Sequence, residues 1–207
     1  METLLADGLE KLGISLSDFQ HHQLETYWSE LILWNSRYGL VNADGDELII
    51  KHFLDSFSAV PVLRTLDFDT ICDVGSGGGF PGLVLSIYFP EKKCTLIERS
   101  AKKALFLANT AVMMHASNVE VLAEDADLVR QKFDLVLFRA LGQFGSYFPT
   151  LYRLAAPGGH LFAFKGKKSE VRREIGALPA DIQDRSKCIS AHVPFLDDER
   201  NFVIIQR

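Results

Sequence analysis

The sequence predicts an α/β fold: a mainly parallel seven-stranded sheet wound by helices, with an N-terminal helical extension. Three observations lead to this prediction. Residues 1–65 show helical periodicity, apolar strand-like runs alternate with helical stretches from residue 70 onward, and a glycine-rich run follows the first of these strands. Short apolar strands between helices are typical of parallel sheets that are covered on both faces.

The helical extension, predicted over residues 1–65, contains two amphipathic helices. Ser17 and Gln20 have the spacing of a capping box, which predicts a helix over 18–38. Its predicted apolar face consists of Leu24, Tyr27, Trp28, Leu31, Trp34 and Tyr38. After the turn NADGD, Asp46 is predicted to cap a second helix, ELIIKHFLDSFSAV. We expect the two tryptophans in the core rather than as platforms for nucleotide bases.

The second predicted unit, residues 66–207, carries the sheet. The predicted strands are TICDV (70–74), KKCTLIE (92–98), VEVLA (119–123), FDLVLFR (133–139), GHLFAFK (159–165), a strand near 187–193, and NFVIIQ (201–206). Predicted helices over 81–89, 101–115 and 145–155 connect them. This order predicts one doubly wound domain with its helical extension packed on the core.

Composition and charge limit the class of protein. The chain has 207 residues and a net charge of −5, which argues against broad nonspecific binding to nucleic acid but leaves room for a local basic face. No apolar run approaches the roughly 20 residues of a membrane helix, and the N-terminus lacks a basic segment typical of a signal peptide. We therefore expect a cytoplasmic protein without membrane contact, and a monomer by default.

The three cysteines, Cys72, Cys94 and Cys188, are far apart and sit in apolar strand-like runs. This placement predicts reduced core thiols rather than a disulfide framework or a zinc site. No cluster of ligands suggests any other metal, and none is expected.

The glycine-rich run DVGSGGGFPG, residues 73–82, predicts a ligand-binding turn. Gly75, Gly77 and Gly79 allow a tight turn and close approach of the backbone to a ligand. In open parallel sheets, ligands bind at the carboxyl ends of the strands, where this run lies. Gly77, Gly79 and Gly82 also match the dinucleotide-binding fingerprint, which alone is weak support for a nicotinamide cofactor.

Acidic residues at three predicted strand ends favour S-adenosylmethionine (SAM) over a dinucleotide. Asp73 precedes the glycines, as in the D-x-G-x-G-x-G loop associated with SAM enzymes. Glu98 ends the second strand, where it can accept hydrogen bonds from a ribose diol, and the acidic run 124–127, which contains Asp127, follows the third strand. Acids tolerate a positive sulfonium better than a pyrophosphate. The sequence therefore predicts the Rossmann-like fold of SAM-dependent methyltransferases, with ordinary turn glycines and helix-cap acids as the alternative.

The ends of the next two strands carry cations. Arg139 lies in LFRALG, residues 137–142, and Lys165 lies in FAFKG; such a pair suits a phosphate or nucleotide substrate. No Asn/Asp-Pro-Pro-aromatic loop or cysteine follows the fourth strand, which argues against exocyclic amines and pyrimidine carbon-5. Ring nitrogen N7 of guanine has a free lone pair, so alignment and desolvation could suffice for catalysis. Alternatively, Arg139 pairs with Glu98 or Asp127, and Lys165 is a surface lysine.

Several motifs together resemble one family. WNSRYGL, KHFLDS, ICDVGSGGGFPGLVLSI, RSAKKALFL, FRA, FAFKG and ERNFVII occur in the order and spacing of the RsmG (GidB) family, from about Gly13 to Ile205. These proteins are bacterial 16S ribosomal RNA methyltransferases that form 7-methylguanosine in the small subunit. The resemblance implies a SAM-dependent rRNA (guanine-N7)-methyltransferase.

The resemblance also implies roles for individual residues. Carried over by position, the SAM contacts come from Gly75, Phe80, Ala126, Asp127 and Arg139, and Glu98 takes the place of the ribose-binding acid. The helix with His52, Asp55 and Ser56 on one face packs beside the active site in the family. Direct catalysis by His52 and Asp55 and simple polar packing both stay open. The chain departs from the family pattern at Gly39, Val41, Asp125 and Phe138.

Basic residues cluster near the carboxyl edge of the predicted sheet. They are Lys165, Lys167, Lys168, Arg172 and Arg173, with Arg99, Lys102 and Lys103 after the second strand. A solvated helix face is the alternative for such a run. We expect the run at 165–173 to contact phosphates of 16S rRNA or of the small ribosomal subunit. The competing functions are a SAM methyltransferase of a small molecule or protein, and a nicotinamide-dependent oxidoreductase or noncatalytic nucleotide-binding module.

Overall fold

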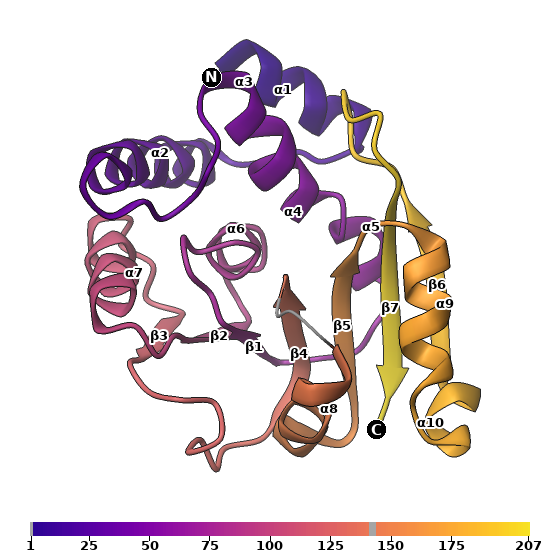
Figure 1. Ribbon diagram of the computed structural model, residues 1–207. Helices are drawn as coiled ribbons and strands as arrows, with labels where there is room; N and C mark the ends of the chain where they lie inside the picture. Colours follow the sequence, from indigo (N-terminus) through magenta and orange to yellow (C-terminus); the bar gives the residue numbers. More distant parts are fainter. Residues whose placement is uncertain (1, 141–143) are drawn as a thin grey trace.

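The computed structural model describes residues 2–140 and 144–207 and shows helices on both faces of one sheet (Figure 1). The strands are β1 (Thr70–Val74), β2 (Lys93–Ile97), β3 (Val119–Leu122), β4 (Phe133–Arg139), β5 (Ala155–Lys165), β6 (Ser186–Ala191) and β7 (Arg200–Gln206). The helices are α1 (Glu2–Lys11), α2 (Asp18–Tyr38), α3 (Gly45–Leu48), η1 (Ile49–Leu54), α4 (Asp55–Phe57), α5 (Val60–Leu63), α6 (Gly82–Tyr88), α7 (Ala101–Met113), α8 (Phe144–Leu154), α9 (Lys168–Gly176) and α10 (Ala180–Asp184).

The sheet is mainly parallel, as predicted. Its seven strands have the order β3-β2-β1-β4-β5-β7-β6. The pairs from β3 to β5 are parallel, whereas β7 runs antiparallel to both β5 and β6. Because β7 is antiparallel, its first residues lie at the carboxyl edge of the parallel strands: Asn201 pairs with Lys165 at the end of β5. This edge is where ligands bind in such sheets.

Each face of the sheet has its own hydrophobic cluster. The N-terminal helices, α6 and α7 pack on one face, where Leu31, Phe53 and Phe106 join Leu96 and Phe162 of the sheet in one cluster. Helices α8, α9 and α10 cover the other face, around Cys72, Val136 and Leu161. Figure 1 shows the two groups of helices on opposite sides of the strands. The N-terminal extension therefore shares a continuous core with the sheet.

Helix α2 follows the sequence prediction closely. Ser17 caps it and forms the predicted capping box with Gln20, and Gly39 ends it in a left-handed conformation. The predicted apolar face is buried at Leu24, Tyr27 and Leu31, and both tryptophans are half-buried against the core. Tyr38, the last residue of the predicted apolar face, is 43% exposed and packs its ring against Trp34.

The second predicted helix differs in two ways. It begins at Gly45 after Asp44, whose extended backbone (φ −139°) makes it the cap, so Asp46 lies in the first turn and is not the cap. The predicted continuous helix is also interrupted: η1 is a π-helical segment between two short α-helical pieces. π-helical turns within helices often occur at functional sites. This segment carries His52 and leads directly into Asp55.

The core contains reduced thiols, as the composition predicted. Cys72 and Cys94 are free and buried, and burial raises the pKa of both thiols. Cys188 is free and half-buried. Within residues 2–140 and 144–207, no helix has the length and apolar character needed to cross a membrane.

Gly82, the first residue of α6, is a position where the close packing of helix and sheet can be tested. A Cβ atom at this position would lie 2.6 Å from Oδ2 of Asp73 and would also clash with Leu96. We expect Gly82→Ala to lower the free energy of unfolding by about 1–3 kcal/mol, because overpacking of a closed core has this cost. Thermal unfolding would show a melting temperature lower by several degrees.

Gly176→Ala is the matched control, since a Cβ atom there meets nothing within 4 Å. It should leave the melting temperature unchanged or raise it, because alanine favours a helix more than glycine does. Equal melting temperatures for the two variants would contradict the packing described for Gly82.

Candidate active site

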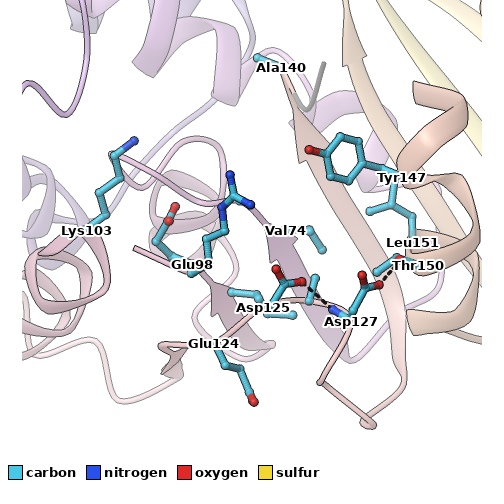
Figure 2. Close-up of a pocket in the computed structure, with 14 residues that line it drawn as sticks. Val74, Glu98, Lys103, Glu124, Asp125, Asp127, Ala140, Tyr147, Thr150 and Leu151 are labelled. Atoms are coloured by element: carbon cyan, nitrogen blue, oxygen red, sulfur yellow. Dashed lines mark hydrogen bonds between the residues drawn. The ribbon is translucent and has the colours of Figure 1, made fainter. Parts of the chain in front are cut away.

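A cavity of about 510 Å³ opens at the carboxyl ends of the parallel strands. Its walls come from the ends of β1 and β2, the turn after β3, Ala140 after β4, and one face of α8 (Figure 2). Four of the predicted cofactor-binding residues line it: Gly75, Glu98, Ala126 and Asp127. The predicted residues Asp73, Gly77, Gly79, Phe80 and Arg139 are not among the described residues of its lining.

The glycine-rich loop is held in place by side chains from outside it. Gly75 has a φ of +75° and Gly79 a φ of +93°, values that residues other than glycine rarely adopt. The hydroxyl of Tyr27 in α2 donates a 2.6 Å hydrogen bond to the carbonyl oxygen of Gly78. A Cβ atom at Gly79 would lie 2.6 Å from that hydroxyl. The N-terminal extension thus fixes the loop from the side opposite β1.

Glu98 connects the cavity to the loop. Its carboxylate is only 7% exposed and accepts hydrogen bonds from the backbone N–H groups of Gly77 (2.9 Å) and Ser100 (2.8 Å). Each carboxylate oxygen can accept more than one hydrogen bond. Glu98 can therefore hold the loop and still accept hydrogen bonds from hydroxyl groups of a ligand in the cavity.

Asp73 lies below the cavity rather than in it. It is 1% exposed, and its Oδ2 accepts a 3.0 Å hydrogen bond from the N–H of Gly82. Burial raises the pKa of its carboxyl group to about 6, although the hydrogen bond from Gly82 lowers it in part. Asp73 therefore joins the end of β1 to the start of α6, and this geometry gives it a structural role.

The acidic turn after β3 forms one wall of the cavity. Asp125 accepts a 3.0 Å hydrogen bond from the N–H of Asp127, and Asp127 accepts one from the hydroxyl of Thr150 in α8. Arg153, also in α8, donates a 2.8 Å hydrogen bond to the carbonyl oxygen of Ala126. Figure 2 shows the two aspartates with the α8 residues beside them. The turn is thus fixed by the helix on the other face of the sheet.

Helix α8 contributes cavity residues that the sequence analysis missed. Tyr147, Thr150 and Leu151 line the cavity, and Tyr147 is 43% exposed. In Figure 2, Tyr147 lies on the opposite side of the cavity from Lys103. The three positions have the i, i+3, i+4 spacing of one helical face, which was a usable signal. No role was predicted for this face because the predicted cofactor-binding residues came from the glycine-rich loop and the strand ends.

Next to the cavity, Arg139 at the end of β4 is held by the π-helical segment and its neighbour. Its guanidinium donates to Asp55 Oδ2 (3.1 Å) and to the carbonyl oxygen of Lys51 (3.2 Å), and contacts His52 Nδ1 at 2.8 Å. It also lies over the ring of Phe80, 5.5 Å from its centroid. The suggested alternative partners of Arg139, Glu98 and Asp127, were wrong, because Asp55 takes this place.

The contact with Arg139 defines the state of His52. An arginine side chain can only donate hydrogen bonds, so Nδ1 of His52 must be the acceptor and the imidazole is neutral. Burial and, to a smaller extent, the positive charge of Arg139 together lower the pKa of His52 to about 4. His52, Asp55 and Arg139 are thus brought together, in line with what the resemblance to the RsmG family implied for this helix. Residues 141 and 142 of the predicted LFRALG segment lie outside the described residues.

Lys165 is close to Arg139 in the sheet but has its own partner. The ends of β4 and β5 are adjacent, with Arg139 paired to Phe164. Lys165 Nζ forms a 2.7 Å ion pair with Glu174 of α9 and lies 4.9 Å from the centroid of Phe144. Each of the two predicted cations is therefore paired with an acid, so the edge is less basic than the sequence suggested.

Comparison with known proteins gives one consistent family. The model of the family described as "rRNA small subunit methyltransferase G" (GidB) matches residues 20–203. Proteins named "Ribosomal RNA small subunit methyltransferase G" from Burkholderia multivorans and Ectopseudomonas mendocina are 35% and 36% identical, respectively, each over 98% of this chain. The alignments cover 91% and 94% of those two relatives.

Solved structures show the same fold. An O-methyltransferase from Bacillus cereus, in complex with SAH, has a TM-score of 0.61 at 17% identity and covers 88% of this chain and 90% of its own. A putative O-methyltransferase from Klebsiella pneumoniae has a TM-score of 0.59 at 15% identity and covers 96% of this chain and 93% of its own. The fold is therefore the Rossmann-like fold of SAM-dependent methyltransferases, as predicted.

The low pKa of His52 predicts a specific pH dependence of stability. Because its pKa falls from the ordinary 6.5 to about 4 on folding, the unfolded chain binds more protons between these values. The stability contributed by His52 is therefore present above pH 6.5 and is lost as the pH falls towards 4. The free energy of unfolding should fall by roughly 3 kcal/mol at most over this range, and by less where solvent screens the site.

Two measurements check this prediction. In NMR titrations, the resonance that disappears in His52→Gln should titrate well below pH 6 in the wild-type protein. Chemical denaturation should show that His52→Gln loses less stability than the wild type on acidification. The raised pKa of Asp73 has the opposite effect on stability, since it favours folding at low pH. The difference between the wild type and His52→Gln therefore reports on His52, because Asp73 is present in both. Parallel stability curves would contradict the neutral state of His52.

Proposed function

Because this chain belongs to the rRNA small subunit methyltransferase G family, we propose that it transfers a methyl group from SAM to N7 of a guanosine in 16S rRNA. The observation that carries the proposal is the family match over residues 20–203, together with near-full-length relatives of the same name. The enzyme is a SAM-dependent methyltransferase acting on rRNA of the small ribosomal subunit. We assign catalysis to residues 66–207 and treat residues 1–65 as the extension packed on them.

The cavity fits SAM in size and chemistry. Its volume of about 510 Å³ lies within the range of roughly 300–1,000 Å³ typical of small-molecule sites. Gly75 allows close approach of a ligand, Glu98 can accept hydrogen bonds from hydroxyl groups, and Asp127 places negative charge in the wall. We propose that these residues and Ala126 hold the cofactor. When bound, the cofactor supplies a methyl group activated on a positively charged sulfonium.

The protein's own contribution to the chemistry is alignment rather than proton transfer. N7 of guanine carries a free lone pair, so no proton has to be removed before the attack. Nδ1 of His52 accepts a hydrogen bond from Arg139 and is not available as a base. We therefore propose that His52 and Asp55 orient Arg139, and that Arg139 contacts the cofactor beside Ala140, which lines the cavity. Positioning of two reactants in this way can supply much of a rate enhancement.

The rRNA is proposed to bind along the basic start of α9. Lys167, Lys168, Arg172 and Arg173 are all exposed, next to the carboxyl edge of the sheet. Lys165 is half-buried and paired with Glu174, so we assign it a smaller share of RNA binding. The net charge of −5 means that such contacts must be local. We propose that the protein acts as a monomer in the cytoplasm, where its substrate is assembled.

Mass mapping of modified nucleotides tests the proposed reaction directly. In 16S rRNA from a strain without this gene, we expect one 7-methylguanosine to be missing and to return when the wild-type gene is supplied. Calorimetry with purified protein should show binding of SAM and no binding of NAD. Persistence of every 7-methylguanosine in the deletion strain would overturn the assignment of N7 of guanosine.

Charge reversal tests the proposed RNA surface. Lys167→Glu with Lys168→Glu should weaken binding of small-subunit rRNA and lower the slope of affinity against salt, because two phosphate contacts are lost. The affinity for SAM should change little. Lys93→Glu with Arg130→Glu is the charge-matched control, since both residues are exposed near the amino ends of the strands. Equal RNA binding by the two double variants would exclude this surface.

A further inference from the structure

One buried carboxylate joins two arginines from different strands. Asp55, in the N-terminal extension, is 3% exposed. Its Oδ2 accepts from Nη1 of Arg139 at the end of β4 (3.1 Å), and its Oδ1 accepts from Nε of Arg200 at the start of β7 (3.2 Å). The antiparallel direction of β7 brings Arg200 to the same sheet edge as Arg139. Arg200 lies in the ERNFVII motif, and no role was predicted for it from the sequence.

The two arginines hold the carboxylate by different oxygens, and this fixes its orientation. A carboxylate that meets a single arginine readily turns to form a two-pronged pair with it. Here Nε of Arg200 donates to Oδ1 and therefore competes with Arg139 for this oxygen, and Arg139 donates to Oδ2 alone. The remaining N–H groups of Arg139 can then contact Nδ1 of His52 and the carbonyl oxygen of Lys51. Without Arg200, a two-pronged pair would draw the guanidinium of Arg139 towards Asp55 and away from His52.

The same arrangement leaves positive charge on the cluster around Arg139. Two guanidinium groups share one carboxylate, and His52 accepts from Arg139 and is neutral. These four side chains therefore carry one net positive charge, and Arg139 directly precedes Ala140, which lines the cavity. With Asp55 and Arg139 alone, the two charges would cancel. An anionic group of a ligand would then gain much less from Arg139.

We propose that Arg200 is a positioning residue for Arg139, acting through Asp55 to keep the guanidinium oriented and its charge available to the anionic carboxylate of SAM. The link to the cofactor rests on the proposed function. The orientation of Arg139 by Arg200 is a property of the protein alone.

Arg200→Gln tests the orientation without any ligand. It frees Oδ1 of Asp55, so Arg139 should move away from His52, and the pKa of His52 measured by NMR should rise. Arg185→Gln is the matched control, because Arg185 also pairs with an aspartate (Asp181, 2.8 Å), but at the surface. Identical titration of His52 in the two variants would overturn the proposal.

Calorimetry with S-adenosylhomocysteine tests the link to the cofactor. Arg200→Gln should weaken binding by at least about tenfold, as expected for losing a hydrogen bond to a charged group. The double variant with Arg139→Gln should bind no worse than Arg139→Gln alone, because Arg200 acts through Arg139. Arg200→Lys should bind more tightly than Arg200→Gln. Wild-type affinity in Arg200→Gln, or losses that multiply in the double variant, would overturn the proposal.

These outcomes separate the inference from the proposed function. A wild-type protein that fails to bind S-adenosylhomocysteine or to methylate small-subunit rRNA overturns the function, while the His52 titration still decides the role of Arg200. If Arg200→Gln does not fold, Arg200→Lys and Arg185→Lys are compared in the same two measurements. Lysine keeps the positive charge but reaches Asp55 less well than arginine does. Arg200→Lys should therefore change the pKa of His52 and the affinity for S-adenosylhomocysteine in the directions expected for Arg200→Gln, but by smaller amounts.

Discussion

The site depends on how the glycine-rich loop is held in one conformation. Three side chains hold this loop. The hydroxyl of Tyr27 binds Gly78 and the carboxylate of Glu98 binds Gly77 from outside the run 73–82, and the carboxylate of Asp73, its first residue, binds Gly82. Glycines allow close approach to a ligand but add conformational freedom that folding must remove. The three hydrogen bonds, two of them to carboxylates, offset this freedom and place the loop beside the cavity.

The distribution of charge around the cavity depends on how the buried and half-buried charges are paired. Buried or half-buried charges in proteins need a partner, since an isolated one is costly to remove from water. Arg139 and Lys165 each have one, in Asp55 and Glu174. The positive charge that remains comes from Arg200, which shares Asp55 with Arg139. A protein with a net charge of −5 can therefore still carry a local net positive charge around Arg139, which directly precedes Ala140 in the wall of the acidic cavity.

Local features were predictable from the sequence, and long-range pairings were not. The capping box of Ser17 and the ends of β1 and β4 follow from residues within a few positions of each other. The partner of Arg139 lies 84 residues away and reaches it through a π-helical turn that periodicity cannot reveal. Strand-end position alone also could not show that Asp73 is buried under the cavity whereas Glu98 lines it.

The N-terminal extension is part of the site rather than an addition to it. Its helices share one hydrophobic cluster with a face of the sheet. The boundary near residue 65 therefore separates the N-terminal helices from the strands along the chain, but the hydrophobic core continues across it. It also supplies Tyr27, which fixes the glycine-rich loop, and Asp55, which orients Arg139. Through Asp55 it is tied to the start of β7 at the other end of the chain. The geometry around Arg139 therefore exists only when the first and last parts of the chain are folded together, which couples completion of the site to folding of the whole chain.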